Sequence, residues 1–160
     1  MNGVEHGTAT LVLPAGYFPP VSYFRFLIRE NDVDIEAHEH FIKQTLRSRC
    51  EIFGANGRLR LSIPVRHENR WKIPIHEILI DHDSSWQQQH WKSIQSAYGQ
   101  AAFFTYYRDG LEELFRSKTE TLFEWNMKCL GLTMQWMKSS TRIHVTTTFN
   151  DYSEIGRAHV

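Results

Sequence analysis

The sequence predicts a single α/β domain, and three observations lead to that class. Short apolar runs bounded by turn residues fill much of the first half of the chain, as expected for strands. An Asn-Gly pair between two alternating runs predicts a β-hairpin at about 41–67, and apolar stripes at helical spacing predict three helices at about 84–131. We therefore expect an α/β fold with a mixed sheet; the alternative is the α+β class.

The composition is that of a folded protein without a strong overall electrostatic field. The chain has 160 residues, 41% hydrophobic and 22% charged, and folding at this length buries roughly 70% of the unfolded surface. Eighteen basic residues balance eighteen acidic ones, which argues against a nucleic acid or an anionic membrane surface as partner. No apolar run approaches the roughly 20 residues that span a bilayer, and residues 1–10 lack a signal-peptide pattern. The sparse cysteines, Cys50 and Cys129, indicate a reducing compartment, so we expect a cytoplasmic protein.

The N-terminal elements are predicted to be a strand, a loop and a helix. The apolar run 10–13 ends at Pro14 and is readable as a buried strand. A helix is expected with Pro20 at its first position, because apolar residues follow at spacings of three and four until Asn31. Residues 33–36 then predict a second strand.

The register of the hairpin follows if Asn56 and Gly57 form a two-residue turn. Ala55 then faces Arg58 across the turn. Six side chains would share one inward face, which makes the register coherent. They pair as Ile52 with Leu61, Cys50 with Ile63, and Ser48 with Val65.

The helical half of the chain begins after another predicted strand at 73–80. Ser85 and Gln88 fit a capping box for the first helix, and Gly99 is expected to end it. Trp86, His90, Ile94 and Tyr98 share one face of that helix.

The end of the third helix is placed at Gly131. A glycine at this position is expected to form a left-handed cap. Residues 132–137 and 143–149 then predict two further strands.

The outward face of the hairpin is strongly basic. Glu51 is its one acid, and Arg47 is expected directly opposite Arg66, an unfavourable pairing of like charges. Clustered guanidinium and ammonium groups can receive a phosphate or carboxylate, with bidentate options for arginine. The alternative is an ordinary solvated face. The basic residues of this face are Lys43, Arg47, Arg49, Arg60 and Arg66.

Two histidine patterns suggest chemistry, and each has a structural alternative. His38 and His40 lie on one side of an extended segment and could bind zinc, but no third ligand is visible, so a polar loop is the alternative. His90 beside Trp86 could act as a general acid or base; the alternative is a helix histidine bonded to backbone. Cys50 is expected to face inward, where a thiol stays protonated and inert.

The familiar catalytic signatures are absent from the sequence. It has no nucleophile elbow, no Gly-rich phosphate loop of the P-loop or dinucleotide kind, and no zinc-protease motif. The sequence therefore predicts no cofactor and no metal.

Several separate blocks of the chain occur together in the order of one known family. They are Tyr17-Phe18-Pro19-Pro20, Lys43-Gln44, Arg47 to Arg49, Ala55-Asn56-Gly57, Ile63-Pro64-Val65, and Trp86 with His90-Trp91. Through these blocks the sequence resembles the WbqC-like family over nearly its whole length. Many relatives carry His-Gln-Pro after the first strand, whereas this chain reads Leu13-Pro14-Ala15 and lacks that histidine.

The resemblance implies a bacterial protein of cell-surface polysaccharide biosynthesis, specifically of O-antigen or lipopolysaccharide. Whether it is an enzyme stays open; an enzyme would be a transferase that transfers a group onto a nucleotide sugar. The alternative is a non-catalytic binding or scaffold module, with Trp86, Trp91 and the Tyr106-Tyr107 pair as its partner surface. The oligomeric state is not determined by the sequence.

The basic face and the resemblance together define a predicted site for an anionic small molecule, either a nucleotide sugar or another phosphate-bearing ligand. Its residues fall into three roles. We expect Lys43, Arg47, Arg49 and Arg66 to contact the anion, His90 to act as acid or base, and Tyr17, Gln44 and Trp86 to line the pocket.

The last residues of the chain read as foreign sequence. Residues 154–160 are what a common sequencing adapter encodes in one frame, and the next codon of that adapter is a stop. We therefore expect one WbqC-like domain over 1–153, incomplete at its C-terminal end, followed by translated adapter.

Overall fold

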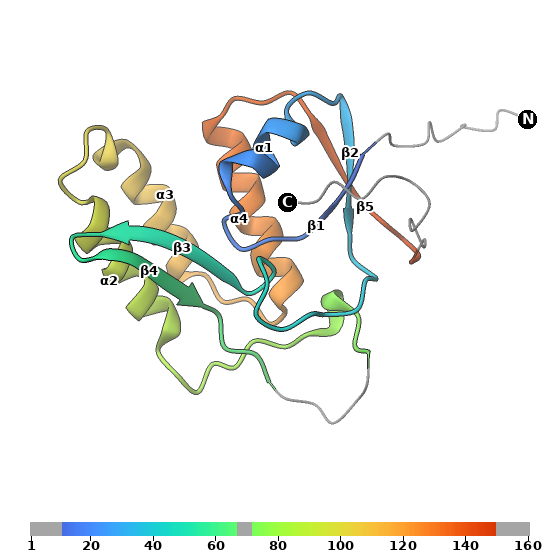
Figure 1. Cartoon of the computed structure of the whole chain (residues 1–160), viewed down its shortest axis with the longest axis horizontal. Helices are drawn as coiled ribbons and strands as arrows, with labels where there is room; N and C mark the ends of the chain where they lie inside the picture. Colours follow the sequence, from blue (N-terminus) through green and yellow to red (C-terminus); the bar gives the residue numbers. More distant parts are fainter. Residues whose placement is uncertain (1–10, 67–71, 150–160) are drawn as a thin grey trace, which may run out of the picture.

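The structure, a computed structural model, describes residues 11–66 and 72–149 and confirms the α/β class. Parallel and antiparallel strand pairs both occur, in two separate ladders, together with four helices in the described ranges. The elements are β1 (Val12–Pro14), α1 (Val21–Leu27), β2 (Asp32–Glu36), β3 (Arg49–Gly54), β4 (Gly57–Ser62), the 3-10 turn η1 (Ile75–Glu77), α2 (Trp86–Tyr98), α3 (Phe104–Arg116), α4 (Leu122–Trp136) and β5 (Arg142–Val145) (Figure 1).

A parallel sheet of β1, β2 and β5 forms one end of the molecule, with β2 in the centre. The segment from β1 to β2 passes through α1, the crossover that parallel neighbours require. Pro20 caps α1 instead of occupying its first turn, so this helix begins one residue later than the sequence predicts. Val33 and Ile35 on β2 are fully buried, as expected for the central strand of a parallel sheet.

The hairpin of β3 and β4 confirms the predicted inward face but corrects the register. Gly54 pairs with Gly57, so Ile52 lies opposite Leu59 and not opposite Leu61. The turn residues are Ala55 and Asn56, and Gly57 alone takes a left-handed φ, of 102°. A slip of two residues leaves every side chain on its predicted face, because side chains alternate with a period of two.

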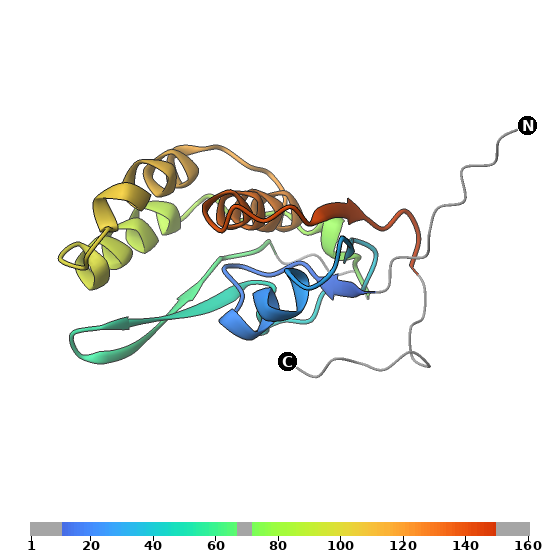
Figure 2. The ribbon, with the colours of Figure 1, turned by 90° about the horizontal axis from the view of Figure 1, so that it is seen from above.

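The helices and the hairpin form two layers. Figure 2 shows α2, α3 and α4 on one side, with the hairpin and α1 on the other. α2 ends at Tyr98 as predicted, and Ser85 is its N-cap, but the side chain of Ser85 makes no capping bond, so the predicted capping box does not form. No helix in the described ranges is long and apolar enough to cross a membrane.

The structure corrects the predictions for three segments, 132–137, 73–80 and 143–149. Gly131 lies inside α4, which continues to Trp136, so residues 132–136 are helical and not part of a strand, and Met137 is the C-cap. Burial of Leu130 and Met134 on either side outweighs the cost of about 1 kcal/mol for a helical glycine.

Residues 73–80 form the 3-10 turn η1 with isolated bridges on both sides, because Pro74 starts that turn and cannot donate a ladder bond. The last predicted strand, 143–149, is the shorter β5.

Two clusters of buried side chains form the core, and α4 contributes to both. Leu122, Trp125 and Cys129 pack with the hairpin and with α2 and α3. Leu130 and Met134, farther along the same helix, pack with the parallel sheet and α1. α4 therefore joins the two ends of the fold. The segment 154–160, predicted to be translated adapter, lies outside the described residues.

Candidate functional site

The site is built where the loop after β1 meets the turn before β3. The backbone N–H of Tyr17 donates to the carbonyl of Leu46 at 2.8 Å, which joins loop 15–20 to turn 43–48. A Cβ at Gly16 would lie 2.7 Å from Leu46 Cδ1, so a larger residue here would require the Leu46 side chain to shift. The two segments therefore form one continuous wall.

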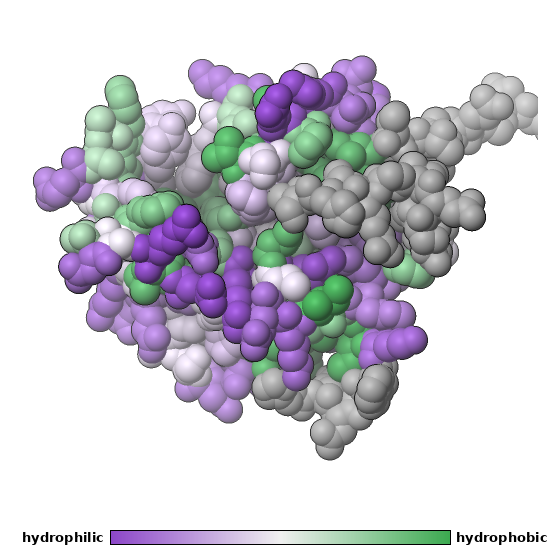
Figure 3. All heavy atoms as spheres, viewed as in Figure 1, coloured by the Kyte–Doolittle hydropathy of each residue, from purple (hydrophilic) through white to green (hydrophobic). Residues whose placement is uncertain are grey.

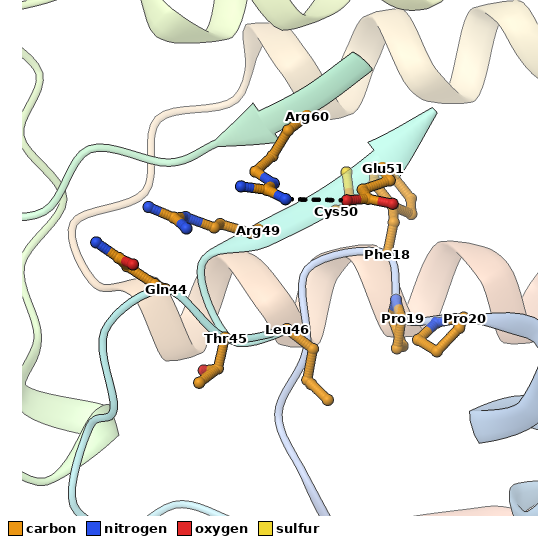
Figure 4. A pocket seen from close by; sticks show the side chains of 10 residues that line it. All are labelled: Phe18, Pro19, Pro20, Gln44, Thr45, Leu46, Arg49, Cys50, Glu51 and Arg60. Atoms are coloured by element: carbon orange, nitrogen blue, oxygen red, sulfur yellow. Dashed lines mark hydrogen bonds and ion pairs between the residues drawn. The ribbon is translucent and has the colours of Figure 1, made fainter. Parts of the chain in front are cut away.

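A pocket of about 420 Å³ lies against this wall and is bordered by the hairpin. Three polar side chains, those of Gln44, Arg49 and Arg60, point to the same side of it (Figure 4). Arg60 also donates to Glu51 at 3.2 Å. We name this cavity the polar pocket; its lining residues are Phe18, Pro19, Pro20, Gln44, Thr45, Leu46, Arg49, Cys50, Glu51 and Arg60. Figure 3 shows strongly hydrophilic side chains gathered over the hairpin on this face of the molecule.

Strained backbone borders the polar pocket on two sides. Phe18 has a φ of 41° and Gln44 a φ of 63°, both in the left-handed region that bulky or long side chains rarely adopt. Such conformations cost about 1–3 kcal/mol each and concentrate at binding and catalytic sites. Their position therefore supports a functional role for the polar pocket.

The predicted anion-binding residues are separated by the fold. Arg49 lines the polar pocket, whereas Arg47 turns away and binds Glu39 through two parallel bonds, with 2.7 Å between Nε and Oε1. Lys43 and Arg66 are exposed and do not line the pocket. Arg47 precedes β3, so the predicted pairing of Arg47 with Arg66 is wrong.

Arg47 supports the turn that carries Gln44. The side chain of Arg47 is 12% exposed, and its backbone carbonyl accepts a bond of 2.8 Å from Asn126 Nδ2 on α4. In the sequence the arginines of this segment look alike, because only the folded chain brings Glu39 to Arg47. The structure thus gives Arg47 a supporting role and leaves Arg49 to face a ligand.

Tyr17, Trp86 and His90 come together, as predicted, but in the core. The Tyr17 hydroxyl lies 2.8 Å from His90 Nδ1, and the Trp86 ring meets the His90 ring edge-on at 5.2 Å. None of the three lines the polar pocket. Burial lowers the pKa of His90 from 6.5 to about 4, against a smaller opposing effect of the Ser62 backbone. His90 is therefore neutral at pH 7, and its role as acid or base stays a prediction.

The thiol of Cys50 links this buried group to the pocket wall. Cys50 lines the polar pocket and packs against the core cluster that contains Tyr17. Burial raises the pKa of Cys50 to about 12, and the nearby Glu51 carboxylate adds to the increase. The thiol is protonated at neutral pH, in agreement with the sequence-based expectation of an inert cysteine.

A second, apolar pocket of about 530 Å³ adjoins the first. It lies between β3 and the three long helices, and the two pockets share Phe18, Cys50 and Glu51. The sequence analysis missed this cavity, although aromatic residues in and around α3 were a signal for it. We name it the apolar pocket; its other lining residues are Ile52, Ile94, Tyr98, Ala101, Ala102, Phe104, Tyr107, Leu111, Thr133, Trp136 and Met137.

The histidines near the end of β2 make contacts within the protein. The rings of His38 and His76 meet edge-on at 4.6 Å, and His76 Nδ1 donates to the Ala37 carbonyl at 2.7 Å. Over residues 11–66 and 72–149, no group of three or more His, Cys, Asp or Glu side chains is placed to hold a metal ion.

Comparison with known proteins places the chain in a family. The model of the WbqC-like protein family matches residues 15–158. The chain belongs to the WbqC-like protein family. It is also similar to the uncharacterized protein Rv1507c of Mycobacterium tuberculosis, with 26% identity over 133 residues. That alignment covers 82% of this chain and 57% of the relative, so this WbqC-like protein spans little more than half the length of the relative. No solved structure matches it.

Three of the six sequence blocks named above contribute to the polar pocket. Phe18, Pro19 and Pro20 come from the first block, and Gln44 comes from the block Lys43-Gln44. Arg49, the last residue of a third block, supplies a guanidinium group. The loop after β1 and the segment before and at the start of β3 thus contribute to one cavity.

Proposed function

We propose that this WbqC-like protein binds the phosphate of a small anionic molecule in the polar pocket. The ligand is a nucleotide sugar or another phosphate ester, and the protein transfers a group onto it in bacterial cell-surface polysaccharide biosynthesis. The observation that supports this proposal is the convergence of Arg49, Arg60 and the Gln44 amide on one pocket with a strained wall. Charged and amide donors in this arrangement suit the oxygens of a phosphate group.

The balance of charge in the polar pocket favours an anion. Two guanidinium groups face one carboxylate, Glu51, which is already bound by Arg60 at 3.2 Å and approached by Arg58 at 3.7 Å. Arg49 forms no ion pair with any residue that the structure describes, so its guanidinium donors are available to a ligand. An arginine offers five N–H donors, enough for a bidentate contact.

Glu51 is the lining group best suited to proton transfer in this proposal. Its carboxylate borders both pockets, where it can accept a proton from a hydroxyl or amine of the bound molecule. The Cys50 thiol, whose pKa is about 12, is a poor nucleophile in the free protein. His90 is bonded to Tyr17 in the core and does not line the polar pocket.

The second candidate function is a non-catalytic binding module, and exposed aromatic residues favour it. Phe103 is 80% and Tyr106 67% exposed near the start of α3. Of the predicted partner surface, however, Trp86 is buried in the core and Trp91 is half-buried against Phe104 and Phe115. Tyr106 and Tyr107 would therefore form such a surface without the tryptophans.

The test measures binding of inorganic pyrophosphate and of UDP-glucose by calorimetry. Arg49→Gln removes the available guanidinium while keeping a polar side chain, and we expect affinity to fall by about 10- to 100-fold, the value of a hydrogen bond to a charged group. Arg66→Gln is the matched control, because Arg66 is exposed and outside the pocket. Equal losses in both variants, or no binding to the wild-type protein, would contradict the proposal.

A further inference from the structure

We infer that the phosphate of the ligand is attached to a hydrocarbon chain, and that this chain fills the apolar pocket. The inference rests on the proposed function, because it assigns the phosphate to the polar pocket. The lining of the adjoining apolar pocket then decides which phosphate-bearing ligands fit.

The two pockets adjoin each other. Phe18, Cys50 and Glu51 line both, so the same three side chains border the two spaces. A molecule with a phosphate beside Arg49 can therefore extend past Phe18 into the apolar pocket. The volume of about 530 Å³ lies in the range of roughly 300–1,000 Å³ that is usual for small-molecule sites.

The lining of the apolar pocket suits a hydrocarbon. It is lined by the buried aliphatic side chains of Ile52, Ile94 and Leu111. Phe104 and Trp136 add aromatic surface. Removing apolar ligand surface from water against such groups is favourable and needs no directed partner.

The apolar pocket offers few polar side chains to a nucleobase, and most of them already make one bond within the protein. The Tyr98 hydroxyl already accepts a bond from the Phe53 N–H at 3.1 Å, and the Thr133 hydroxyl donates to the Cys129 carbonyl at 2.9 Å. Glu51 is held by two arginines, and Tyr107 is the remaining hydroxyl among the lining residues. A buried purine or pyrimidine edge would leave several of its donors and acceptors without partners, which is costly. A hydrocarbon chain has no such groups.

The charge distribution fixes the direction of the ligand. Positive charge lies at the polar pocket, on Arg49 and Arg60, and no lining residue of the apolar pocket carries a positive charge. The phosphate end is therefore held at the hairpin, and the apolar end points toward the start of α3 and the end of α4. Ala102 and Phe104 line the pocket at that end.

The experiment compares ethyl, hexyl and decyl phosphate, each below its micelle concentration, with UDP-glucose, by calorimetry on the full chain. We expect affinity to rise along the alkyl series, by about two- to fourfold for each methylene that the pocket buries and at least about tenfold from ethyl to decyl. Arg49→Gln should weaken all alkyl phosphates by a similar factor.

Ala102→Trp tests the apolar pocket directly, because Ala102 is exposed on its rim and a large side chain there fills the space without removing a core contact. The gain from ethyl to decyl phosphate should disappear in this variant. Ala55→Trp is the matched control, an exposed alanine in the hairpin turn that lines neither pocket. Met137→Asp, at another lining position that is 41% exposed, should give the same loss through a charge.

The outcomes separate this inference from the proposed function. Equal affinity for ethyl and decyl phosphate, with Arg49→Gln still weakening both, overturns the hydrocarbon chain and leaves the phosphate site standing. Loss of UDP-glucose binding in Ala102→Trp, without an effect on decyl phosphate, places a base in the apolar pocket and also overturns the inference. A dimer that Ala102→Trp converts to a monomer makes the pocket an interface, with the same consequence. Absence of binding by every phosphate refutes the proposed function itself.

Discussion

The sheet end and the hairpin end of the molecule bury their side chains in different ways. At the sheet end, Leu27, Val33 and Ile35 are fully buried, and none of them lines either pocket. At the hairpin end, β3 and β4 turn one face to the helices and the other to solvent, and both pockets border β3. A parallel sheet is stable only when covered on both sides, whereas a hairpin can leave space beside it. The comparison teaches that both pockets border the half of the fold built from the hairpin and helices, whereas the buried side chains of the parallel sheet leave no pocket among these residues.

The largest effect should come from core truncation at either end. Trp125 is fully buried and contacts Trp86 and Phe115, so Trp125→Ala should cost about 3–5 kcal/mol of unfolding free energy. Leu27→Ala, at the sheet end, should cost about 2–5 kcal/mol. Because α4 packs into both clusters, chemical denaturation should show one shared transition in each variant. Two separate transitions would show that the ends fold independently.

The next effect is the acid sensitivity that His90 confers on the hairpin end. The folded protein holds the pKa of His90 at about 4, below its ordinary value of 6.5, so the unfolded chain binds a proton first as the pH falls. Above pH 6.5, neutral His90 makes its full contribution to the free energy of unfolding. This contribution is lost as the pH falls from 6.5 to 4, and the loss is about 3 kcal/mol at most.

His90→Gln should flatten the dependence of stability on pH in that window, as measured by urea denaturation from pH 7 to pH 4. The two proteins differ only at position 90, so the difference between the two curves reports His90. Identical slopes would show that burial leaves this imidazole unperturbed.

A smaller effect is expected at the wall that joins the two ends. In Gly16→Ala the new methyl group would lie 2.7 Å from Leu46 Cδ1, the flexible end of a half-buried side chain that can move away. We expect a loss of about 1 kcal/mol of unfolding free energy, the low end of the cost of overpacking, together with weaker pyrophosphate binding. Gly131→Ala is the control, because a Cβ there meets nothing within 4 Å. Unchanged binding in Gly16→Ala would separate the loop from the site.

The smallest effect should come from the exposed ion cluster on the sheet. Hydrogen bonds from Arg142, and then from His144, lower the pKa of Asp32 from 3.8 to about 2. Arg142→Ala should raise this pKa toward 3.8 in a carboxyl titration followed by NMR, and should hardly change stability at neutral pH, because exposed ion pairs contribute little. The contribution of the pair is present above pH 3.8 and is lost as the pH falls toward 2. A large shift of the neutral-pH unfolding midpoint would contradict this.

Periodicity predicts the elements of this fold better than their ends. The inward face of the hairpin and the buried stripe of Trp86, His90 and Ile94 follow from spacing alone, and both are confirmed. Gly131 was expected to end a helix, but the packing of its neighbours carries the helix past it, and such packing is tertiary information. The observed register of the hairpin differs by two residues from the predicted one for a local reason, because only Gly57 takes a positive φ in the turn.

The sequence indicates which types of residue occur in the candidate site, but it does not indicate the role of each residue. The basic segment was recognised, and Arg49 and Gln44 do face a pocket. Arg47 could not be told from Arg49, since the distinction depends on Glu39 and Asn126, which reach the turn only in the folded chain. Tyr17 and Trp86 were expected to line the pocket, but both lie in the core with His90, because their depth in the fold is not encoded by spacing.

Phe18, Cys50 and Glu51 lie between the two pockets and line both of them. An occupant that displaces one of these side chains changes the space on its other side, so the affinities of the two pockets are linked. Such a linkage is reciprocal: whatever factor the first occupant applies to the affinity of the second, the second applies to the first. For the inferred ligand, which would fill both pockets, these side chains set the length at which its head and its tail can both be seated.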